Sequence, residues 1–364
     1  MGSAPPRSAV RLPVAKIAVL ALALTALASF RPLVAAPASA VDMLAFLGTD
    51  AGFSADDLRR LERGEVVSRG MATADDGVAI AAATYMGVPA AFFLDRFRQI
   101  EQFKKTAEVQ QIGRLSAAPS AADLAQLTLE SAELKDAREC RIGHCSFKLD
   151  ATGIEKLHAT RDDAAAMVAL REHLAAFAST YLRQGNTALM EYRDRSRPMA
   201  VDAQLQQVVA EFSFLRRDWP VLHGTLADFT GTLPPGLEHF VYWSKEKVAP
   251  RPVVSLTHVV IQPLRGGMAA LASKQLYASH YTTGSLGLTL LAEQTGEAGP
   301  RTLVMYFNRT RVDVFSGLLG GVKRPVVRSR ARAGAERMMT GLKTRLEGDF
   351  RRSLTPGPAT SFRQ

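Results

Sequence analysis

The chain has 364 residues, 47% of them hydrophobic and 22% charged, and it carries a formal net charge of +10 at pH 7. This composition is typical of a globular protein and excludes a largely disordered one. The length is sufficient for one large domain or two ordinary ones.

The first forty residues predict a bacterial-type secretory signal peptide. Three basic residues and no acid precede the apolar run 17–30, and small residues then lead to the cleavage pattern Ala38-Ser39-Ala40. The run is shorter than the roughly 20 apolar residues that cross a bilayer comfortably, so an uncleaved anchor is the less favoured alternative. We therefore expect cleavage near Ala40 and a periplasmic or secreted protein.

Residues 41–115 are expected to form the N-terminal part of an α+β domain. A helix is expected over 41–63, where Ser54 and Asp57 have the spacing of a capping box and Gly64 can end the helix. The remaining elements expected here are strands at 65–71, 78–88 and 108–115 and a helix at 90–105.

Residues 116–235 change to a mainly helical pattern, which predicts a helical insertion. Apolar side chains recur every three or four residues from Met167 to Tyr181 and again from Leu205 to Leu215, as on amphipathic helices. A short helix at 121–127 and a short strand at 146–149 are also expected. The pattern leaves open whether 151–230 is a lid, an insertion or a separate domain.

The two cysteines, Cys140 and Cys145, lie within this insertion. Two nearby cysteines in an exported protein are expected to form a disulfide, and Gly143 between them suits a tight turn. The spacing is not the Cys-x-x-Cys of redox or haem-attachment motifs, so we expect the disulfide to be structural.

Residues 236–350 predict antiparallel strands followed by a long helix. Five strand candidates occupy 239–247, 253–262, 271–281, 286–293 and 301–313. Short connections without helices require neighbouring strands to run antiparallel. An amphipathic helix is expected over 328–350, and residues 351–364 are expected to be a disordered tail.

This order of elements resembles the START-like, or SRPBCC, helix-grip superfamily. The resemblance is carried by GEVVSRG (64–70), the strand-to-helix step at Val88-Pro89 within 78–97, the strands of 239–313 and the closing helix 328–350. It implies an antiparallel sheet that grips a long C-terminal helix, with a hydrophobic ligand held between them. The chain is also similar to exported bacterial proteins of unassigned function through CRIGHCSFKL, VYWSKEK, YASHY and NRTRVD.

Standard catalytic and metal-binding patterns are missing. The sequence contains no G-x-S-x-G elbow, no His-Glu-x-x-His, no Walker loop and no histidine pair at metal-ligand spacing. Glu172-His173 stands alone. We therefore expect no metal and no cofactor, and we name no catalytic residue.

Polar side chains on the late strands are the candidates for binding a ligand. Strand alternation places Gln275 and Tyr277 on one face, and it places Tyr306 and Asn308 on the face opposite Arg309. The ligand-binding candidates are Tyr277, His280, Tyr306, Asn308, Arg309 and His258, which could orient an amphipathic molecule between apolar walls. The alternative is that the tyrosines are ordinary sheet residues and that Arg309 belongs to a surface ion network.

The positive charge is concentrated near the C-terminus. Residues 320–352 contain ten lysines and arginines against three acids, an excess of +7. Such a region could make peripheral contact with an anionic membrane or an acidic partner, although a solvated helix face is the simpler interpretation. No nucleic-acid-binding motif is present, and we expect no nucleic acid partner.

These observations lead to one functional hypothesis and two alternatives. We expect a periplasmic binding protein for a hydrophobic or amphipathic small molecule, lipid-like in chemistry, held in a cavity between the sheet and the C-terminal helix. The first alternative is a cyclase- or hydrolase-like enzyme that uses the same cavity, centred on His280, Tyr277 or Tyr306. The second is an envelope protein that docks through the helices of 151–230.

Overall fold

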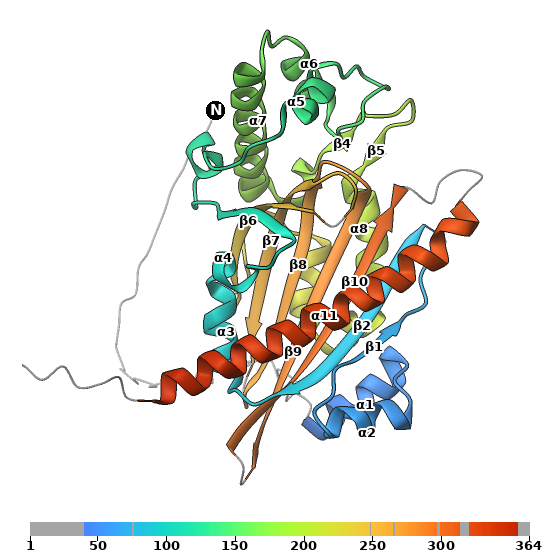
Figure 1. Cartoon of the computed structure of the whole chain (residues 1–364), viewed down its shortest axis with the longest axis vertical. Coiled ribbons are helices and arrows are strands. Elements are labelled where there is room, and N and C mark those ends of the chain that lie inside the picture. The colour runs from blue at the N-terminus through green and yellow to red at the C-terminus, as the bar shows by residue number, and fades with distance from the viewer. Residues whose placement is uncertain are drawn as a thin grey trace, which may run out of the picture. The chain divides into compact units, whose positions relative to one another are not determined.

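A single antiparallel sheet organises the protein (Figure 1). The computed structural model describes residues 40–74, 76–247, 249–264, 266–296, 299–313 and 320–355. The strands of the sheet are β1 (Val67–Gly70), β2 (Gly77–Met86), β3 (Val109–Arg114), β6 (Glu238–Glu246), β7 (Val253–Pro263), β8 (Met268–Ala278), β9 (Thr282–Gly296) and β10 (Gly299–Val312). Their order is β1-β2-β10-β9-β8-β7-β6-β3, and each neighbouring pair is antiparallel. The prediction of an α+β chain with antiparallel late strands is therefore confirmed.

Helices cover both faces of the sheet, which explains why β2 is buried along its whole length. On one face lie α3 (Ala90–Arg98), α4 (Ile100–Phe103) and the long α11 (Gly320–Leu354). Ala335, Met339 and Leu346 of α11 join the same buried apolar cluster as Phe93 of α3 and Val304 of β10. This face therefore carries the closing C-terminal helix.

The other face is covered by α1 (Ala40–Ala51), α2 (Ala55–Glu62) and the elements that connect β3 to β6. These are η1 (Ala121–Leu124), α5 (Ser131–Arg138), α6 (Ala151–His158), α7 (Asp163–Gln184), η2 (Gly185–Ala188), β4 (Glu191–Tyr192), β5 (Met199–Ala200), α8 (Val201–Ala210), α9 (Ser213–Asp218) and α10 (Pro220–Ala227). Phe214 and Trp219 of this helical insertion share a core with Phe307 of β10. The insertion therefore packs on the sheet and buries the face opposite α11.

Several expected elements are shorter or divided. The helix expected over 41–63 is two helices, because Ser54 begins α2 with a capping box to Asp57 after Gly52 adopts a positive φ of 71°. The expected strand at 146–149 is wrong: Lys148 N–H donates to Ser279 O at 2.8 Å, and the segment forms no extended ladder. The helix expected over 328–350 is longer at both ends.

The disulfide between Cys140 and Cys145 is present, as expected. It closes a turn in which Arg141 and His144 exchange backbone hydrogen bonds of 3.0 and 2.9 Å. The predicted signal peptide lies outside the described residues except for Ala40, which begins α1. Within the part of the chain that the structure describes, no helix combines the length and the apolar character needed to cross a membrane.

Candidate functional site

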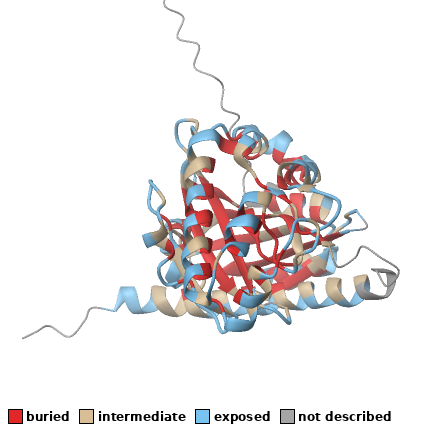
Figure 2. Cartoon of the chain, turned by 90° about the horizontal axis from the view of Figure 1, so that it is seen from above, coloured by how far each residue is buried: buried red, intermediate tan, exposed pale blue. Residues whose placement is uncertain are grey.

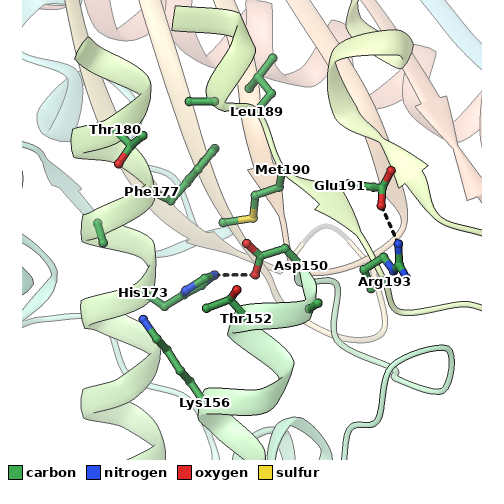
Figure 3. A pocket seen from close by; sticks show the side chains of 13 residues that line it. Asp150, Thr152, Lys156, His173, Phe177, Thr180, Leu189, Met190, Glu191 and Arg193 are labelled. Carbon is green, nitrogen blue, oxygen red and sulfur yellow. Dashed lines mark hydrogen bonds and ion pairs between the residues drawn. The ribbon is translucent and has the colours of Figure 1, made fainter. Parts of the chain in front are cut away.

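A pocket of about 530 Å³ lies in the helical insertion, where α6 and α7 face the segment from η2 to β4 (Figure 3). Its lining combines charged, hydroxyl and apolar side chains: Asp150, Thr152, Lys156, His173, Phe177, Thr180, Leu189, Met190, Glu191 and Arg193, with three alanines. Phe177 and Met190 are buried, whereas Thr152 and Lys156 are exposed. The pocket therefore has an apolar floor and a polar rim.

The sequence places His173 on the floor because it belongs to the apolar stripe of α7. His173 lies three residues after Leu170 and four before Phe177, so all three point to the same side of the helix. Asp150 reaches the same point from α6, where it is the N-cap residue and accepts a hydrogen bond from Gly153 N–H at 2.8 Å. His173 Nε2 lies 3.0 Å from Asp150 Oδ1.

This contact requires a residue without a side chain at the start of α6. A Cβ on Gly153 would lie 2.7 Å from His173 Nε2 and 3.0 Å from Asp150 Oδ1. Burial tends to raise the pKa of Asp150, but His173, the Gly153 N–H and the charge of Lys156 outweigh it and lower the pKa below its usual value. Asp150 is therefore an anion at neutral pH.

The charges on the rim are not evenly matched. Arg193 pairs with Glu191 at 2.8 Å, and Asp150 faces His173. Lys156 makes no ion pair with any residue that the structure describes. An ammonium group at the rim, next to threonine hydroxyls and above an apolar floor, can hold the anionic head of an amphipathic molecule.

The six ligand-binding candidates chosen from the sequence do not form one site. Tyr306 and Asn308 share a face of the sheet, as alternation predicted, and it is the face toward α11. Asn308 accepts a hydrogen bond from Thr310 Oγ1 at 2.8 Å, and its Nδ2 lies 3.4 Å from Ser285 Oγ. Burial, together with Tyr242 and Glu246, raises the pKa of Tyr306 to about 12 against the opposing effect of Lys104.

His258 and Tyr277 lie on the opposite face, beneath the helical insertion. His258 is fully buried, with Nδ1 2.9 Å from Tyr181 Oη and Nε2 2.9 Å from His239 Nδ1. Burial, together with the neighbouring charges of Lys274 and His239, lowers the pKa of His258 well below its usual value. Tyr277 is also fully buried, and its ring contacts Tyr192 edge to face.

A β-bulge explains why Tyr277 is not on the face expected from simple alternation. Leu256 pairs with Tyr277 and Thr257 pairs with Gln275, so Leu276 is an extra residue between them. Both Leu276 and Tyr277 therefore pack into the core under the insertion. The prediction that Gln275 and Tyr277 share a face is wrong for this reason.

Arg309 and His280 are engaged with other parts of the protein. Arg309 Nη1 donates to Glu211 Oε2 and to Ala72 O, both at 2.7 Å, and is buried. The expected alternative of an ion network is correct in kind, but Arg309 itself is buried and its partner Glu211 is only partly exposed. His280 lies beyond the end of β8, and its Nδ1 is 2.8 Å from Ser146 O.

The sequence alone did not identify this pocket or the buried Lys274 of β8. No second histidine stands at metal-ligand spacing from His173, and among the described residues no cluster of three metal-ligating side chains occurs. The sequence signal that could have indicated the pocket is His173, a polar side chain within the apolar stripe of α7. Lys274, in a strand of small apolar residues, is fully buried and donates to Asn186 Oδ1 at 2.7 Å.

Comparison of the sequence with protein-family models and with curated proteins finds no match. The geometry of the site is therefore the basis for the functional proposal.

Proposed function

We propose that this chain is an exported binding protein for a small amphipathic molecule with an anionic head group. The observation that supports this proposal is the mixed lining of the pocket. Phe177 and Met190 form a buried apolar floor, and Lys156 at the rim forms no ion pair with a described residue. Its volume of about 530 Å³ is within the range of small-molecule sites. The ligand class is the one expected from the sequence, but the site proposed here is in the insertion.

The proposal includes the START-like helix-grip fold. It is supported by the sheet order, in which β2 lies beside β10, and by α3 and α4 following β2. The long α11 after the last strand supports it as well. A second cavity between the sheet and α11, near Tyr306 and Asn308, stays a prediction. Export is supported by the Cys140–Cys145 disulfide, which forms in oxidising compartments.

Binding is tested by titrating the purified protein with 11-(dansylamino)undecanoic acid, a fluorescent carboxylate with an apolar body. We expect saturable binding of one probe per chain. Ala176→Trp on α7 should abolish it, because Ala176 lines the pocket from an exposed position where an indole can occupy the mouth without disturbing the core. Ala132→Trp, at an exposed position of α5 outside the pocket, is the matched control and should bind normally.

The role of the rim ammonium is tested separately. Lys156→Gln should weaken probe binding about tenfold, the loss expected for one charge-assisted hydrogen bond. Equal binding by wild type and Ala176→Trp would disprove the pocket as the site. Independently of the probe, native mass spectrometry of protein purified from its own host, followed by extraction of any bound molecule, would identify the natural ligand.

A second candidate function is hydrolysis, which the His173–Asp150 contact favours. A carboxylate beside a histidine orients the ring for general base catalysis. In the described pocket the hydroxyl groups are those of Thr152 and Thr180. Incubating the protein with the methyl ester of the same probe distinguishes the two candidate functions. Release of the free acid by wild type, but not by His173→Ala, would indicate an enzyme.

A further inference from the structure

The helix α11 is the outermost layer on its side of the sheet (Figure 2). Its inner side is fixed to the protein by the buried Ala335, Met339 and Leu346. On the side away from these residues, exposed positions recur from Val326 to Arg351. At about 1.5 Å per residue, the stretch from Arg330 to Arg351 is about 31 Å long.

The basic side chains of α11 from Arg328 to Arg351 make no ion pair with an acid elsewhere in the described part of the chain. Gly320–Leu354 contains ten basic residues and three acids. Basic side chains that reach inward bind backbone carbonyls: Arg328 donates to Gly77 O at 3.1 Å and Lys343 to Gly64 O at 2.6 Å. Arg345 likewise binds Lys105 O at 2.9 Å. Arg352 forms an ion pair with Asp349, but both residues belong to α11, so this pair does not link the helix to the rest of the protein.

Two of the three acids of α11 bind groups in the body of the protein. Glu336 accepts from Ser68 Oγ at 2.9 Å, and Glu347 accepts from Gly87 N–H at 2.9 Å. Both carboxylates therefore lie on the side that faces β1 and the end of β2. The third acid, Asp349, pairs with Arg352 of the same helix, so none of the three forms an ion pair with Arg330, Arg337 or Arg351.

Arginines repeat along this exposed side. Arg330 and Arg337 are seven residues apart, and Arg351 follows after a further fourteen, so all three lie on one side of a helix with 3.6 residues per turn. These three make no side-chain hydrogen bond or ion pair with residues in the described ranges. Small residues lie between them on the same side, and Val326, 49% exposed, precedes them. We call Val326, Arg330, Arg337 and Arg351 the arginine ridge.

We propose that the arginine ridge docks on the surface of an anionic lipid bilayer. A straight, exposed helix with arginines on one side and small residues between them can lie flat on a planar charged surface. Each basic residue near such a surface contributes about 1 kcal/mol, so three give a reversible attachment that salt weakens. The ridge is on the opposite side of the sheet from the pocket, and the two proposals are independent.

The test is co-sedimentation of the purified protein with vesicles of phosphatidylcholine and phosphatidylglycerol in equal parts, compared with pure phosphatidylcholine. We expect binding to the anionic vesicles, little binding to the neutral ones, and a large decrease between 50 and 300 mM salt. Binding to neutral vesicles would indicate insertion of the apolar run 17–30, if retained, and would count against the ridge.

Arg330→Glu/Arg337→Glu should reduce binding at least tenfold while the circular dichroism spectrum stays unchanged, because both side chains are exposed. Arg161→Glu/Arg183→Glu changes the net charge equally on the helical insertion and should bind as wild type does. The proposal is overturned if both double variants lose binding equally, or if neither does. The proposal is also overturned if the protein does not bind anionic vesicles but binds polyglutamate through Arg330 and Arg337.

Discussion

At the scale of single residues, the least common feature is a lysine buried in the sheet. Lys274 of β8 is fully buried, with Nζ 2.7 Å from Asn186 Oδ1 and 3.5 Å from Leu226 O. The ammonium also lies 5.3 Å from the Tyr181 ring centroid. Burial lowers its pKa to about 7, and Asp202 opposes this only in part. The side chain is held by neutral groups, so burying its charge is costly.

This lysine should make stability depend on pH. Between pH 7 and about 10.4 the unfolded chain keeps the proton of Lys274 while the folded chain releases it, so the free energy of unfolding rises with pH. The contribution is at most about 1.4 kcal/mol per pH unit. Lys274→Met should remove this slope between pH 7 and 9, measured by urea unfolding. Lys135→Met, at a side chain 70% exposed, is the control and should leave the slope unchanged; equal slopes in wild type and Lys274→Met would contradict the assignment.

At the scale of elements, the end of α7 determines how the insertion meets the sheet. Gly185 caps α7 with φ 69° and ψ −145°. A Cβ there would lie 1.6 Å from Phe229 O, so the chain after α10 passes directly over this glycine. The neighbouring Asn186 N–H donates to the same carbonyl at 2.7 Å. The Lys274 site is therefore assembled where these two segments cross.

Two glycine substitutions should have opposite effects. Gly185→Ala should lower the free energy of unfolding by more than about 2 kcal/mol, because the positive φ and the backbone contact are both incompatible with a side chain. Gly224→Ala, inside α10 with nothing within 4 Å of its Cβ position, should raise it by about 0.5 to 1 kcal/mol. Chemical denaturation of both variants checks this, and a neutral Gly185→Ala would show that the crossing can relax.

At the scale of the whole molecule, the sheet and the helical insertion share their cores. Trp243 of β6 is buried and its Nε1 donates to Asp123 O at 2.8 Å, at the end of η1. Trp219, between α9 and α10, packs in a cluster that includes Phe307 of β10. The two tryptophans of the sequence thus report on different parts of one packed structure.

Unfolding should therefore be a single transition. Trp219→Phe leaves Trp243 as the fluorophore, and Trp243→Phe leaves Trp219. In each variant the fluorescence midpoint in urea should coincide with the midpoint from far-ultraviolet circular dichroism, as two-state unfolding requires. Separate midpoints would show that the insertion folds as an independent domain.

Local sequence pattern by itself determined the parts of this protein that depend on neighbouring residues. Short connections without helices predicted the antiparallel late strands, and alternation predicted the opposite faces of Tyr306 and Arg309. The short separation of Cys140 and Cys145 predicted the disulfide. These features follow from strand periodicity and short chain separation.

Tertiary structure alone decided which face of the sheet the insertion covers and which side chains meet there. Asp150 and His173 are brought together by the packing of α6 against α7. Lys274 is buried where the end of α7, capped by Gly185, crosses the segment after α10. Tyr277 is turned to the other face of the sheet by a β-bulge. Each depends on contacts between distant segments, whose energies arise only once the complete core is packed, so no local pattern of residues encodes them.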